Sequence, residues 1–458
     1  MYICQNCGFS TPKWFGRCPS CEQWNTLIYE EEKKKKGRKK EELEKDESRK
    51  LESEPEPIYF IAQKNEIDYR IKTSVGEFDR VLGGGIVPGS VILIGGEPGV
   101  GKSTLLLQSA LNVSKDTDVL YVSSEESVMQ IASRVKRISN EENFRSSKLY
   151  LLFENNIEKV FSHAKKIFRK DGLLILDAIQ SFYSEFVDSS PGTITQVREI
   201  TQQSVDFARR YRIPVILVGH VTKEGVVAGP KMLEHMVDVV IYVEAEGMTR
   251  VVRATKNRFG STGELGIFVM TGKGLEEVSD PSTAFLDEDV MNFPGASISA
   301  VVEGTRVYII EIQALVSRTP FGVPRRTSQG YDVVRLNTII AVLEKFAGIT
   351  LWDKDVFLNV AGGLKISDVS MDLAVALSIT SSYLGIPIGK RVAFGEIGLL
   401  GEIRTPSFFE QRVKEAKRIN PEAIITGKMK KKFDLEEKFI SLPYVKDIIP
   451  YINSLGKK

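Results

Sequence analysis

Gly96-Glu97-Pro98-Gly99-Val100-Gly101-Lys102-Ser103 fits the pattern G-x-x-x-x-G-K-[ST] of a phosphate-binding loop. An apolar run at residues 91–94 precedes it, and Thr104 with three leucines follows, so the context predicts a strand, a turn and a helix. In such a loop the glycines let backbone amides point at phosphate oxygens, the lysine reaches the outer phosphates, and the serine hydroxyl coordinates Mg²⁺. The sequence therefore predicts that residues 96–104 bind ATP with Mg²⁺ and that the chain hydrolyses ATP.

Further apolar runs extend this unit over residues 59–280. They lie at residues 119–122, 173–176, 215–218 and 239–243, and amphipathic helical stretches separate them. Continuous apolar strands joined by crossover helices indicate a mostly parallel sheet that is covered on both faces. The predicted fold class is α/β, and phosphate chemistry is expected at the carboxyl ends of the strands.

Three polar residues follow these strands. Asp177 ends one strand and is predicted to hold the water shell of Mg²⁺. Glu125 follows another strand and is the candidate that orients and deprotonates the attacking water. His220 ends a third strand, where it can sense the γ-phosphate. A helix cap, a surface acid and a structural histidine are the ordinary alternatives for these three residues.

The N-terminus carries two C-x-x-C pairs, and all 4 cysteines fall in them. They are Cys4, Cys7, Cys18 and Cys21. Two short loops that each aim two thiolates at one ion predict a closed, tetrahedral Zn²⁺ site with a structural role, in a zinc finger over residues 1–28. A redox pair or cysteines without a metal are the alternatives.

Aromatic residues surround these pairs, namely Trp14, Phe15 and Trp24, together with Arg17. A cover over the small zinc core is the preferred interpretation. Stacking on nucleic-acid bases or contact with a protein is the alternative.

The bulk composition bounds the remaining possibilities. A chain of 458 residues is too long for one ordinary core, which favours two large domains. A net charge of +2 gives no global case for nucleic-acid binding, so any basic surface must be local, as at residues 33–40. Residues 29–58 are predicted to be a charged linker, either solvated or touching nucleic acid. No apolar run is long enough for a bilayer, so we expect a cytoplasmic protein without a membrane partner.

Residues 119–127, with Glu125 and His220, resemble the core of RecA-type ATPases. The pentapeptide Lys256-Asn257-Arg258-Phe259-Gly260 resembles the signature of the bacterial RadA (Sms) family of DNA repair proteins. That resemblance implies an N-terminal four-cysteine zinc finger, a RecA-like ATPase core and a C-terminal domain similar to the Lon protease domain, here residues 281–458. In this last domain, strands are expected at residues 297–303, 307–316 and 356–360, and a helix from about residue 371.

The resemblance also implies an activity. Its members form hexameric rings on single-stranded DNA, act with a RecA-type recombinase, and drive branch migration of recombination intermediates with ATP. In related rings, cations such as Lys256 and Arg258 enter the phosphate site of the neighbouring subunit. Exposed strand charges are the alternative.

DNA contacts are expected in two segments that face the centre of such a ring. The segment after Asp177 offers Phe182, Tyr183 and Phe186 for stacking on bases. The segment after His220 offers Lys223 among glycines, Gly225 and Gly229.

Proteolysis by the last domain is a rival hypothesis. Lon-type proteolysis needs a Ser-Lys dyad. Ser370 falls at the serine position, but Glu410 falls at the lysine position, so we expect the serine to be inert. Lys414, one helical turn further on, is the alternative dyad partner. A third hypothesis is a regulatory ATPase that clusters through its zinc finger, with turnover that is indifferent to DNA.

Overall fold

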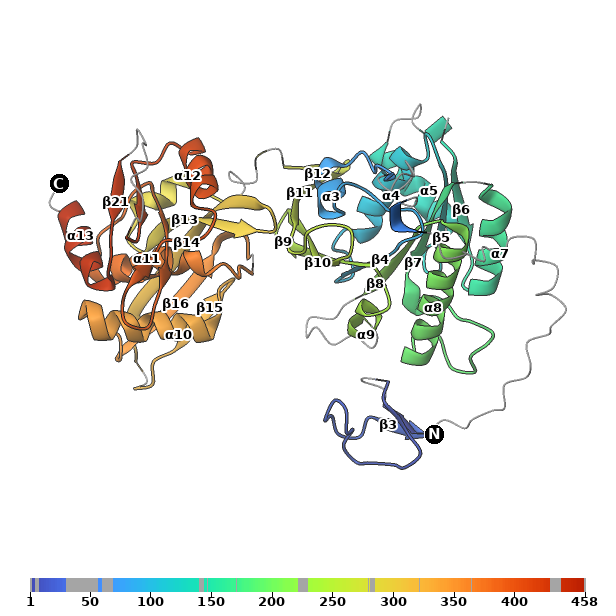
Figure 1. Cartoon of the computed structure of the whole chain (residues 1–458), viewed down its shortest axis with the longest axis horizontal. Coiled ribbons are helices and arrows are strands. Elements are labelled where there is room, and N and C mark those ends of the chain that lie inside the picture. The colour runs from blue at the N-terminus through green and yellow to red at the C-terminus, as the bar shows by residue number, and fades with distance from the viewer. Residues whose placement is uncertain are drawn as a thin grey trace. The chain divides into compact units, whose positions relative to one another are not determined.

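The computed structural model describes residues 2–4, 8–29, 57–59, 69–139, 144–145, 147–169, 171–220, 230–278, 280, 285–320, 322–363, 365–428 and 438–456. The chain forms two compact units, Met1–Glu277 and Val278–Lys458 (Figure 1). Within the described ranges, no helix is long and apolar enough to cross a membrane.

A nine-stranded sheet forms the centre of the first unit, in the order β12-β11-β10-β9-β4-β8-β7-β5-β6. Its strands are β4 (Val91–Gly96), β5 (Asp118–Ser123), β6 (Leu149–Phe153), β7 (Gly172–Asp177), β8 (Val215–His220), β9 (Val239–Glu246), β10 (Thr249–Asn257), β11 (Leu265–Thr271) and β12 (Gly274–Glu277). Neighbours from β9 to β6 in this order pair in parallel, and β9 to β12 pair antiparallel. The prediction of a mostly parallel sheet is confirmed.

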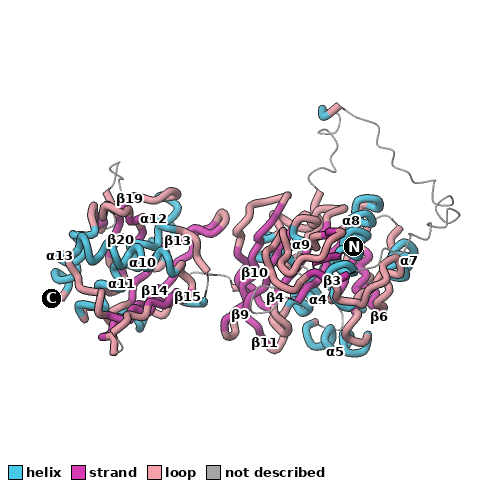
Figure 2. Tube along the Cα trace, turned by 90° about the horizontal axis from the view of Figure 1, so that it is seen from below, coloured by secondary structure: helices cyan, strands magenta, loops and turns pink. Residues whose placement is uncertain are grey.

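Helices cover both faces of this sheet (Figure 2). They are α3 (Gly76–Val81), α4 (Lys102–Val113), α5 (Val128–Ile138), α7 (Ile157–Ile167), the 3₁₀ turn η2 (Ile179–Ser181), α8 (Ile194–Tyr211) and α9 (Pro230–Glu234). Ile92 and Ile94 pack into a core with α4 and α5, while Val91 and Leu93 pack into a second core with α7 and α8. Successive residues of β4 are thus buried on opposite faces, which explains the continuous apolar run.

A small three-stranded sheet lies at the N-terminal end of the described residues and includes Cys4. Its strands are β1 (Tyr2–Cys4), β2 (Ser10–Thr11) and β3 (Leu27–Tyr29), in the order β2-β1-β3. Its core consists of Cys4, Cys18 and Leu27, with Tyr2 and Phe9 packed against them. So small a core buries little apolar area, which fits a fold that a metal completes.

The second unit is a seven-stranded mixed sheet in the order β15-β16-β14-β13-β17-β20-β21, with a separate two-stranded sheet, β18-β19. Its strands are β13 (Ala296–Glu303), β14 (Arg306–Arg318), β15 (Arg326–Gln329), β16 (Lys354–Val360), β17 (Arg391–Phe394), β18 (Glu396–Ile397), β19 (Ile403–Arg404), β20 (Ala423–Thr426) and β21 (Phe439–Ser441). The strands expected at residues 297–303, 307–316 and 356–360 are confirmed as β13, β14 and β16.

Helices and short turns complete the second unit. They are η3 (Glu288–Asn292), α10 (Val333–Val342), the π-helical η4 (Leu343–Ala347), η5 (Ala361–Gly363), η6 (Val369–Met371), α11 (Asp372–Leu384), α12 (Phe409–Arg418), η7 (Val445–Asp447) and α13 (Ile448–Leu455). Helix α11 packs against β13 and β14, and its residues 372–381 are all buried. The helix expected from about residue 371 is therefore the central helix of this unit.

Candidate functional site: a nucleotide-binding cavity

The phosphate loop connects the end of β4 to the start of α4. Gly99 and Gly101 have φ angles of +76° and +110°, which residues with a side chain rarely adopt. A Cβ atom on Gly101 would also lie 2.8 Å from the side chain of Met270. The backbone conformation therefore favours glycine at both positions, as the pattern in the sequence predicts.

Lys102 is the first residue of α4, and its ammonium group curls back over the loop. Its Nζ donates to the carbonyl oxygens of Gly96 at 2.7 Å and Glu97 at 2.9 Å. Burial lowers the pKa of Lys102, while the nearby carboxylates of Asp177 and Glu125 act in the opposite direction. The side chain is 4% exposed, so its charge is directed at the loop and the cavity beside it.

A tyrosine hydroxyl connects the two residues predicted to hold Mg²⁺. The Tyr121 hydroxyl donates to a carboxylate oxygen of Asp177. A side-chain hydrogen bond also joins it to Ser103, and burial followed by the charge of Asp177 raises the pKa of Tyr121 well above its usual value. Tyr121 was not among the predicted site residues. The only signal for it is a tyrosine within an otherwise aliphatic strand.

Both carboxylate oxygens of Glu125 have partners. His220 Nε2 lies 3.3 Å from Oε2, and the Ser181 hydroxyl donates to Oε1 at 2.8 Å. The hydrogen bond with His220 is the main cause of a lowered pKa for Glu125, and the Ser181 hydrogen bond and Lys102 act in the same direction. The other ring nitrogen of His220, Nδ1, lies 3.4 Å from the Lys102 ammonium nitrogen. Glu125 is thus held as a carboxylate close to the phosphate loop, where a catalytic base is needed.

These residues surround one cavity of about 420 Å³. Its lining consists of Pro98, Gly99, Gly101, Lys102, Ser103, Thr104, Ser123, Glu125, Glu126, Arg134, Arg137, Asp177, His220 and Met270. Gly96, Glu97 and Val100 line a neighbouring cavity of about 240 Å³. The structure therefore brings together the residues predicted to form the loop, to hold magnesium, to act as the base and to sense the γ-phosphate. Outside the loop, the lining contains two arginines and three carboxylates.

Arg134 and Arg137 are the two basic lining residues that sequence reasoning missed, and Ser123, Glu126 and Met270 were missed as well. Both arginines belong to α5, whose apolar face carries Ile131 and Val135 into the core. Arg134 Nη2 lies 2.6 Å from a carboxylate oxygen of Glu126. The amphipathic pattern of α5 indicates which face is buried, but not that its polar face borders the nucleotide cavity.

The two cations of the pentapeptide lie outside this cavity's lining. Lys256 Nζ donates to the main-chain oxygens of Glu234 at 2.6 Å and Val237 at 2.8 Å, and burial lowers its pKa. Arg258 Nη1 lies 3.2 Å from Oδ1 of Asp238, and the arginine side chain is 52% exposed. The two side chains contact the same segment, residues 234–238.

The other members of the pentapeptide have packing roles. The Asn257 amide donates to the main-chain oxygen of Val81 at 3.3 Å and accepts the Phe259 N–H at 2.9 Å. A Cβ atom on Gly260 would lie 2.8 Å from the Cα atom of Gly83. Asparagine and glycine thus fasten the end of β10 to the end of α3.

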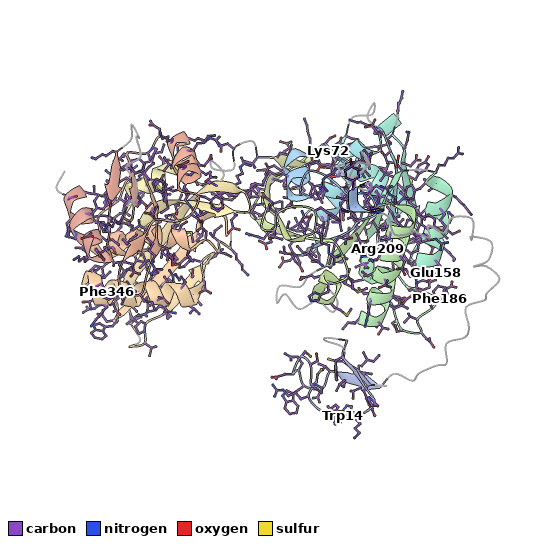
Figure 3. All side chains as sticks on the ribbon, in the orientation of Figure 1. Trp14, Lys72, Glu158, Phe186, Arg209 and Phe346 are labelled. Atoms are coloured by element: carbon purple, nitrogen blue, oxygen red, sulfur yellow. The ribbon has the colours of Figure 1, made fainter. Side chains whose placement is uncertain are left out.

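The aromatic segment after β7 is less exposed than predicted. Phe182 is fully buried in the core with α7 and α8, so its predicted stacking role is wrong. Tyr183 is half-buried, and its backbone pairs with Asn156. Only Phe186 of the three predicted residues is well exposed, at 67% (Figure 3). Lys223, Gly225 and Gly229 lie outside the described residues.

Three of the four predicted zinc ligands converge. The sulfur atoms of Cys4, Cys18 and Cys21 all lie within 4.8 Å of one another, and those of Cys4 and Cys21 are 3.6 Å apart. Ligand sulfurs of a tetrahedral zinc site are about 3.8 Å apart, given a Zn–S bond of about 2.3 Å. The three thiols therefore fit a metal site, and Cys7 lies outside the described residues.

The aromatic residues near the cysteines do not cover the metal site. Trp14, which Figure 3 labels, is 57% exposed, and Phe15 and Trp24 are 41% and 69% exposed. The expected cover over the zinc core is therefore wrong. Tyr2 and Phe9 take that place in the structure.

In the second unit, an arginine occupies the place opposite Ser370. Arg412 Nη1 donates to Ser370 Oγ at 2.6 Å and lies 2.7 Å from Oδ2 of Asp368. Ser370 and Arg412 are 0% and 1% exposed. Glu410 and Lys414 lie on the exposed face of α12, so the assignment of Glu410 to the dyad position was wrong, and Lys414 does not reach the serine.

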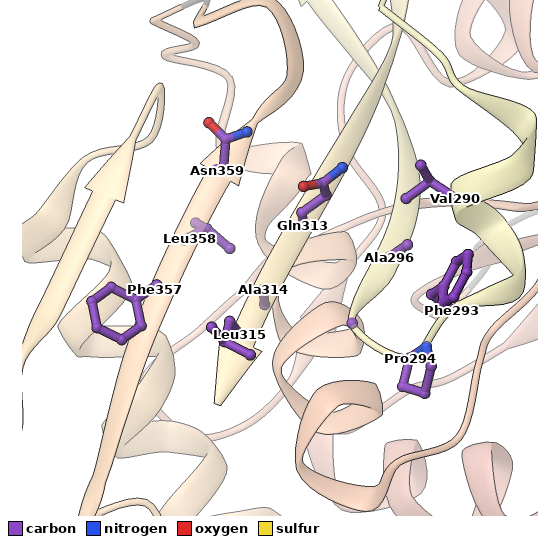
Figure 4. A pocket seen from close by; sticks show the side chains of 11 residues that line it. Val290, Phe293, Pro294, Ala296, Gln313, Ala314, Leu315, Phe357, Leu358 and Asn359 are labelled. Carbon is purple, nitrogen blue, oxygen red and sulfur yellow. The ribbon is translucent and has the colours of Figure 1, made fainter. Parts of the chain in front are cut away.

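A cavity of about 300 Å³ lies elsewhere in this unit, between β13, β14 and β16 (Figure 4). Its lining is Val290, Phe293, Pro294, Gly295, Ala296, Gln313, Ala314, Leu315, Phe357, Leu358 and Asn359. Since none of these side chains titrates and Ser370 is absent from the lining, this cavity has no groups for acid-base or nucleophilic chemistry.

Two family models and several solved structures match parts of this chain. Residues 68–226 match the AAA domain family, and residues 2–28 match the rubredoxin metal binding domain family. Among solved structures, the RadB recombinase matches 46% of this chain and all of its own, at 23% identity and a TM-score of 0.38. A DnaB-like replicative helicase matches 52% of this chain and 71% of its own, at 15% identity and a TM-score of 0.42.

Relatives of similar length match almost end to end. The DNA repair protein RadA of Bacillus subtilis is 45% identical over 422 residues, which cover 91% of this chain and 90% of the relative. The DNA repair protein RadA of Aquifex aeolicus shows the same identity and coverage. With its ATPase domain, its cysteine-rich ribbon and this similarity along its length, the chain belongs to the RadA family of bacterial DNA repair proteins.

Proposed function

We propose that this protein is a DNA-stimulated ATPase of recombinational repair that binds single-stranded DNA and drives branch migration of recombination intermediates. The observation that carries the proposal is the cavity in which Lys102, Asp177 and Glu125 meet, in a chain of the RadA family. Its substrates would be the branched intermediates that a RecA-type recombinase makes in the cytoplasm.

The hydrolytic step follows from the residues around the cavity. Lys102 and the amides of the loop bind the charge on the β and γ phosphates. The Glu125 carboxylate accepts a proton from water, whose oxygen bonds to the γ-phosphorus as the bond to the bridging oxygen breaks, giving ADP and phosphate. Mg²⁺, when bound, neutralises phosphate charge. Ser103 and Asp177 are the residues that would hold it.

Lys256 and Arg258 support an assembly in which one subunit completes the site of the next. Both are cations that lie outside their own chain's nucleotide-cavity lining, and Arg258 is half-exposed. We propose that they stabilise the transition-state charge in a neighbour's cavity, within a ring of six subunits. Lys256 would have to release the oxygens of Glu234 and Val237 to do so.

The N-terminal ribbon would hold Zn²⁺ through Cys4, Cys7, Cys18 and Cys21. Four protein ligands leave no open position, so the ion would stabilise the ribbon and supply no chemistry to ATP hydrolysis. The convergence of three of the sulfurs supports this assignment.

Proteolysis by the second unit is not proposed. The Ser370 hydroxyl accepts a hydrogen bond from the guanidinium of Arg412, and arginine side chains are donors that do not serve as the base for a serine proton. We propose instead that this Lon-like unit serves assembly or DNA contact.

The decisive experiment measures ATP turnover and branch migration with the full chain, with and without single-stranded DNA. DNA should raise kcat, and three-stranded substrates should be resolved in an ATP-dependent manner. If DNA neither binds nor changes turnover and the branched substrates stay unresolved, the motor function is wrong and a regulatory ATPase remains.

A matched pair of variants tests the shared site. Lys256→Ala should lower kcat about 1,000-fold, as loss of an arginine finger does, while ATP binding persists. Lys273→Ala, on the exposed turn before β12, should leave kcat unchanged. Mixing Lys256→Ala with a Lys102→Ala variant should restore part of the activity if the cation acts across subunits. Unrestored activity would place Lys256 in its own chain's chemistry.

A further inference from the structure

The turn η2 lies between the two strand ends that border the nucleotide cavity. It follows directly on β7, the strand that ends at Asp177, and its last residue, Ser181, donates to Glu125. The other oxygen of Glu125 faces His220 at the end of β8. The carboxylate of Glu125 is therefore held between η2 and the last residue of β8, and no hydrogen bond joins it to the phosphate loop within the described part of the chain.

Gln180, the neighbour of Ser181, fastens η2 to the main chain of His220. Its Nε2 donates to the His220 carbonyl oxygen at 3.2 Å, and its Oε1 accepts the His220 N–H at 3.4 Å. Any displacement of η2 thus acts on Glu125 through Ser181 and on His220 through Gln180.

The segment that continues from η2 is held by hydrogen bonds to one side chain of α8. The buried Gln196 of α8 accepts the Ser184 N–H at 2.8 Å and donates to the oxygens of Val187 and Ser189, each at 2.9 Å. The exposed Phe186 lies between these anchors (Figure 3). A displacement of Phe186 would therefore move several connected residues, which continue directly from η2.

We infer that Gln180 and Ser181 form a coupling element that restrains Glu125 until single-stranded DNA engages the Phe186 segment, residues 182–189. This inference rests on the proposed function, since it assumes that DNA stimulates turnover. In the restrained state both oxygens of Glu125 are engaged by protein groups, which leaves fewer lone pairs for the attacking water. DNA that shifts the Phe186 segment, and η2 with it, withdraws the Ser181 hydroxyl and frees one oxygen.

Removal of a single hydroxyl tests the coupling. Steady-state ATP turnover is measured with and without a thymidylate homopolymer as the single-stranded DNA. Ser181→Ala should raise the DNA-free kcat several-fold, leave the DNA-stimulated kcat and the KM for ATP nearly unchanged, and so reduce the stimulation ratio. Ser181→Thr, which keeps a hydroxyl, should restore the ratio. Ser139→Ala removes a hydroxyl at the end of α5 that donates to the Val135 oxygen, and it should behave as the parent protein.

A second measurement separates coupling from a structural role. Because the Ser181 hydrogen bond lowers the pKa of Glu125, its loss should move the acid limb of the kcat profile of Ser181→Ala to higher pH. A fall of kcat in both the presence and absence of DNA, or an unchanged stimulation ratio, overturns the inference. If DNA does not stimulate the parent protein, the proposed function fails. If it does, and Ser181→Ala keeps the same ratio, only the coupling fails.

Discussion

The phosphate loop and the Ser370 cluster both place a serine beside a buried cation, yet they differ in what the cation can still do. Lys102 and Arg412 are almost equally buried, at 4% and 1% exposed. Lys102 lines a cavity together with Ser103, whereas Arg412 is satisfied by Ser370, Asp368 and main-chain oxygens of the second unit. Burial alone does not mark a functional cation. A functional cation also needs an adjacent cavity, and its protein partners must be ones that a ligand can displace.

The largest expected effect comes from removing the cation of the open site. Lys102→Ala should lower ATP turnover by at least about 1,000-fold, because transition-state charge on the phosphates loses its buried counter-charge. Steady-state phosphate release measures this loss. Lys115→Ala, just beyond the end of α4 and exposed, is the control and should retain turnover. Substantial activity in Lys102→Ala would place the nucleotide elsewhere.

The closed cluster should respond in stability instead. Arg412→Ala removes the counter-charge of the largely buried Asp368, which keeps only the N–H groups of Val302 and Ser370, and should cost about 3 kcal/mol of unfolding free energy, the lower end for a broken buried ion pair. Chemical denaturation of the second unit's transition measures the loss. Arg418→Ala, on the same helix with exposed ion pairs to Glu415 and Asp280, should cost less than about 1 kcal/mol. Equal costs for the two variants would contradict the structural role of Arg412.

A smaller effect should follow from removing a contact to the residues that would hold Mg²⁺ in the nucleotide cavity. Tyr121→Phe removes the hydroxyl that contacts Ser103 and Asp177, and should raise the Mg²⁺ concentration needed for half-maximal turnover about 10-fold. Direct Mg²⁺-dependent fluorescent-nucleotide binding provides a readout apart from turnover. Tyr150→Phe, a half-exposed tyrosine of β6, should not change it. An unchanged Mg²⁺ requirement in Tyr121→Phe would limit this hydroxyl to packing.

The smallest effect concerns the pH dependence of the base. In the proposed mechanism turnover needs Glu125 ionised, so kcat should fall as the pH drops through the pKa of Glu125. His220 is the main cause that lowers this pKa, so His220→Ala should move the acid limb to higher pH, by less than about one pH unit. A kcat profile between acid and neutral pH measures the shift. A shift to lower pH would show that another group sets the limb.

The sequence was sufficient for the parts of the site that depend on local order. A strand, a glycine turn and a lysine at the start of a helix determine the phosphate loop, and Asp177 follows from its position at a strand end. Tyr121 was missed because its role depends on the pairing of β5 with β7, which places Ser123 beside Asp177. No spacing within one strand reveals such a register.

The errors in the second unit and the Phe186 segment have a similar origin. Glu410 and Arg412 differ by two positions on α12, which is about 200° around a helix, so a small misalignment selects the opposite face. Phe182 was misjudged because η2 turns the chain back into the core at that residue. Helix phase and chain reversal are tertiary properties, and residue type alone does not predict them.

Asn257 and Gly260 pack against the end of α3, and these contacts fix the backbone of the pentapeptide. Because the backbone on both sides of Arg258 is fixed, an arginine or lysine tip can search only a small volume set by its own rotamers. A larger residue in place of Gly260 would shift the backbone of the pentapeptide and change the direction of both Lys256 and Arg258, although both charges would still be present. The variant would then lose the orientation of the two cations and keep their charge.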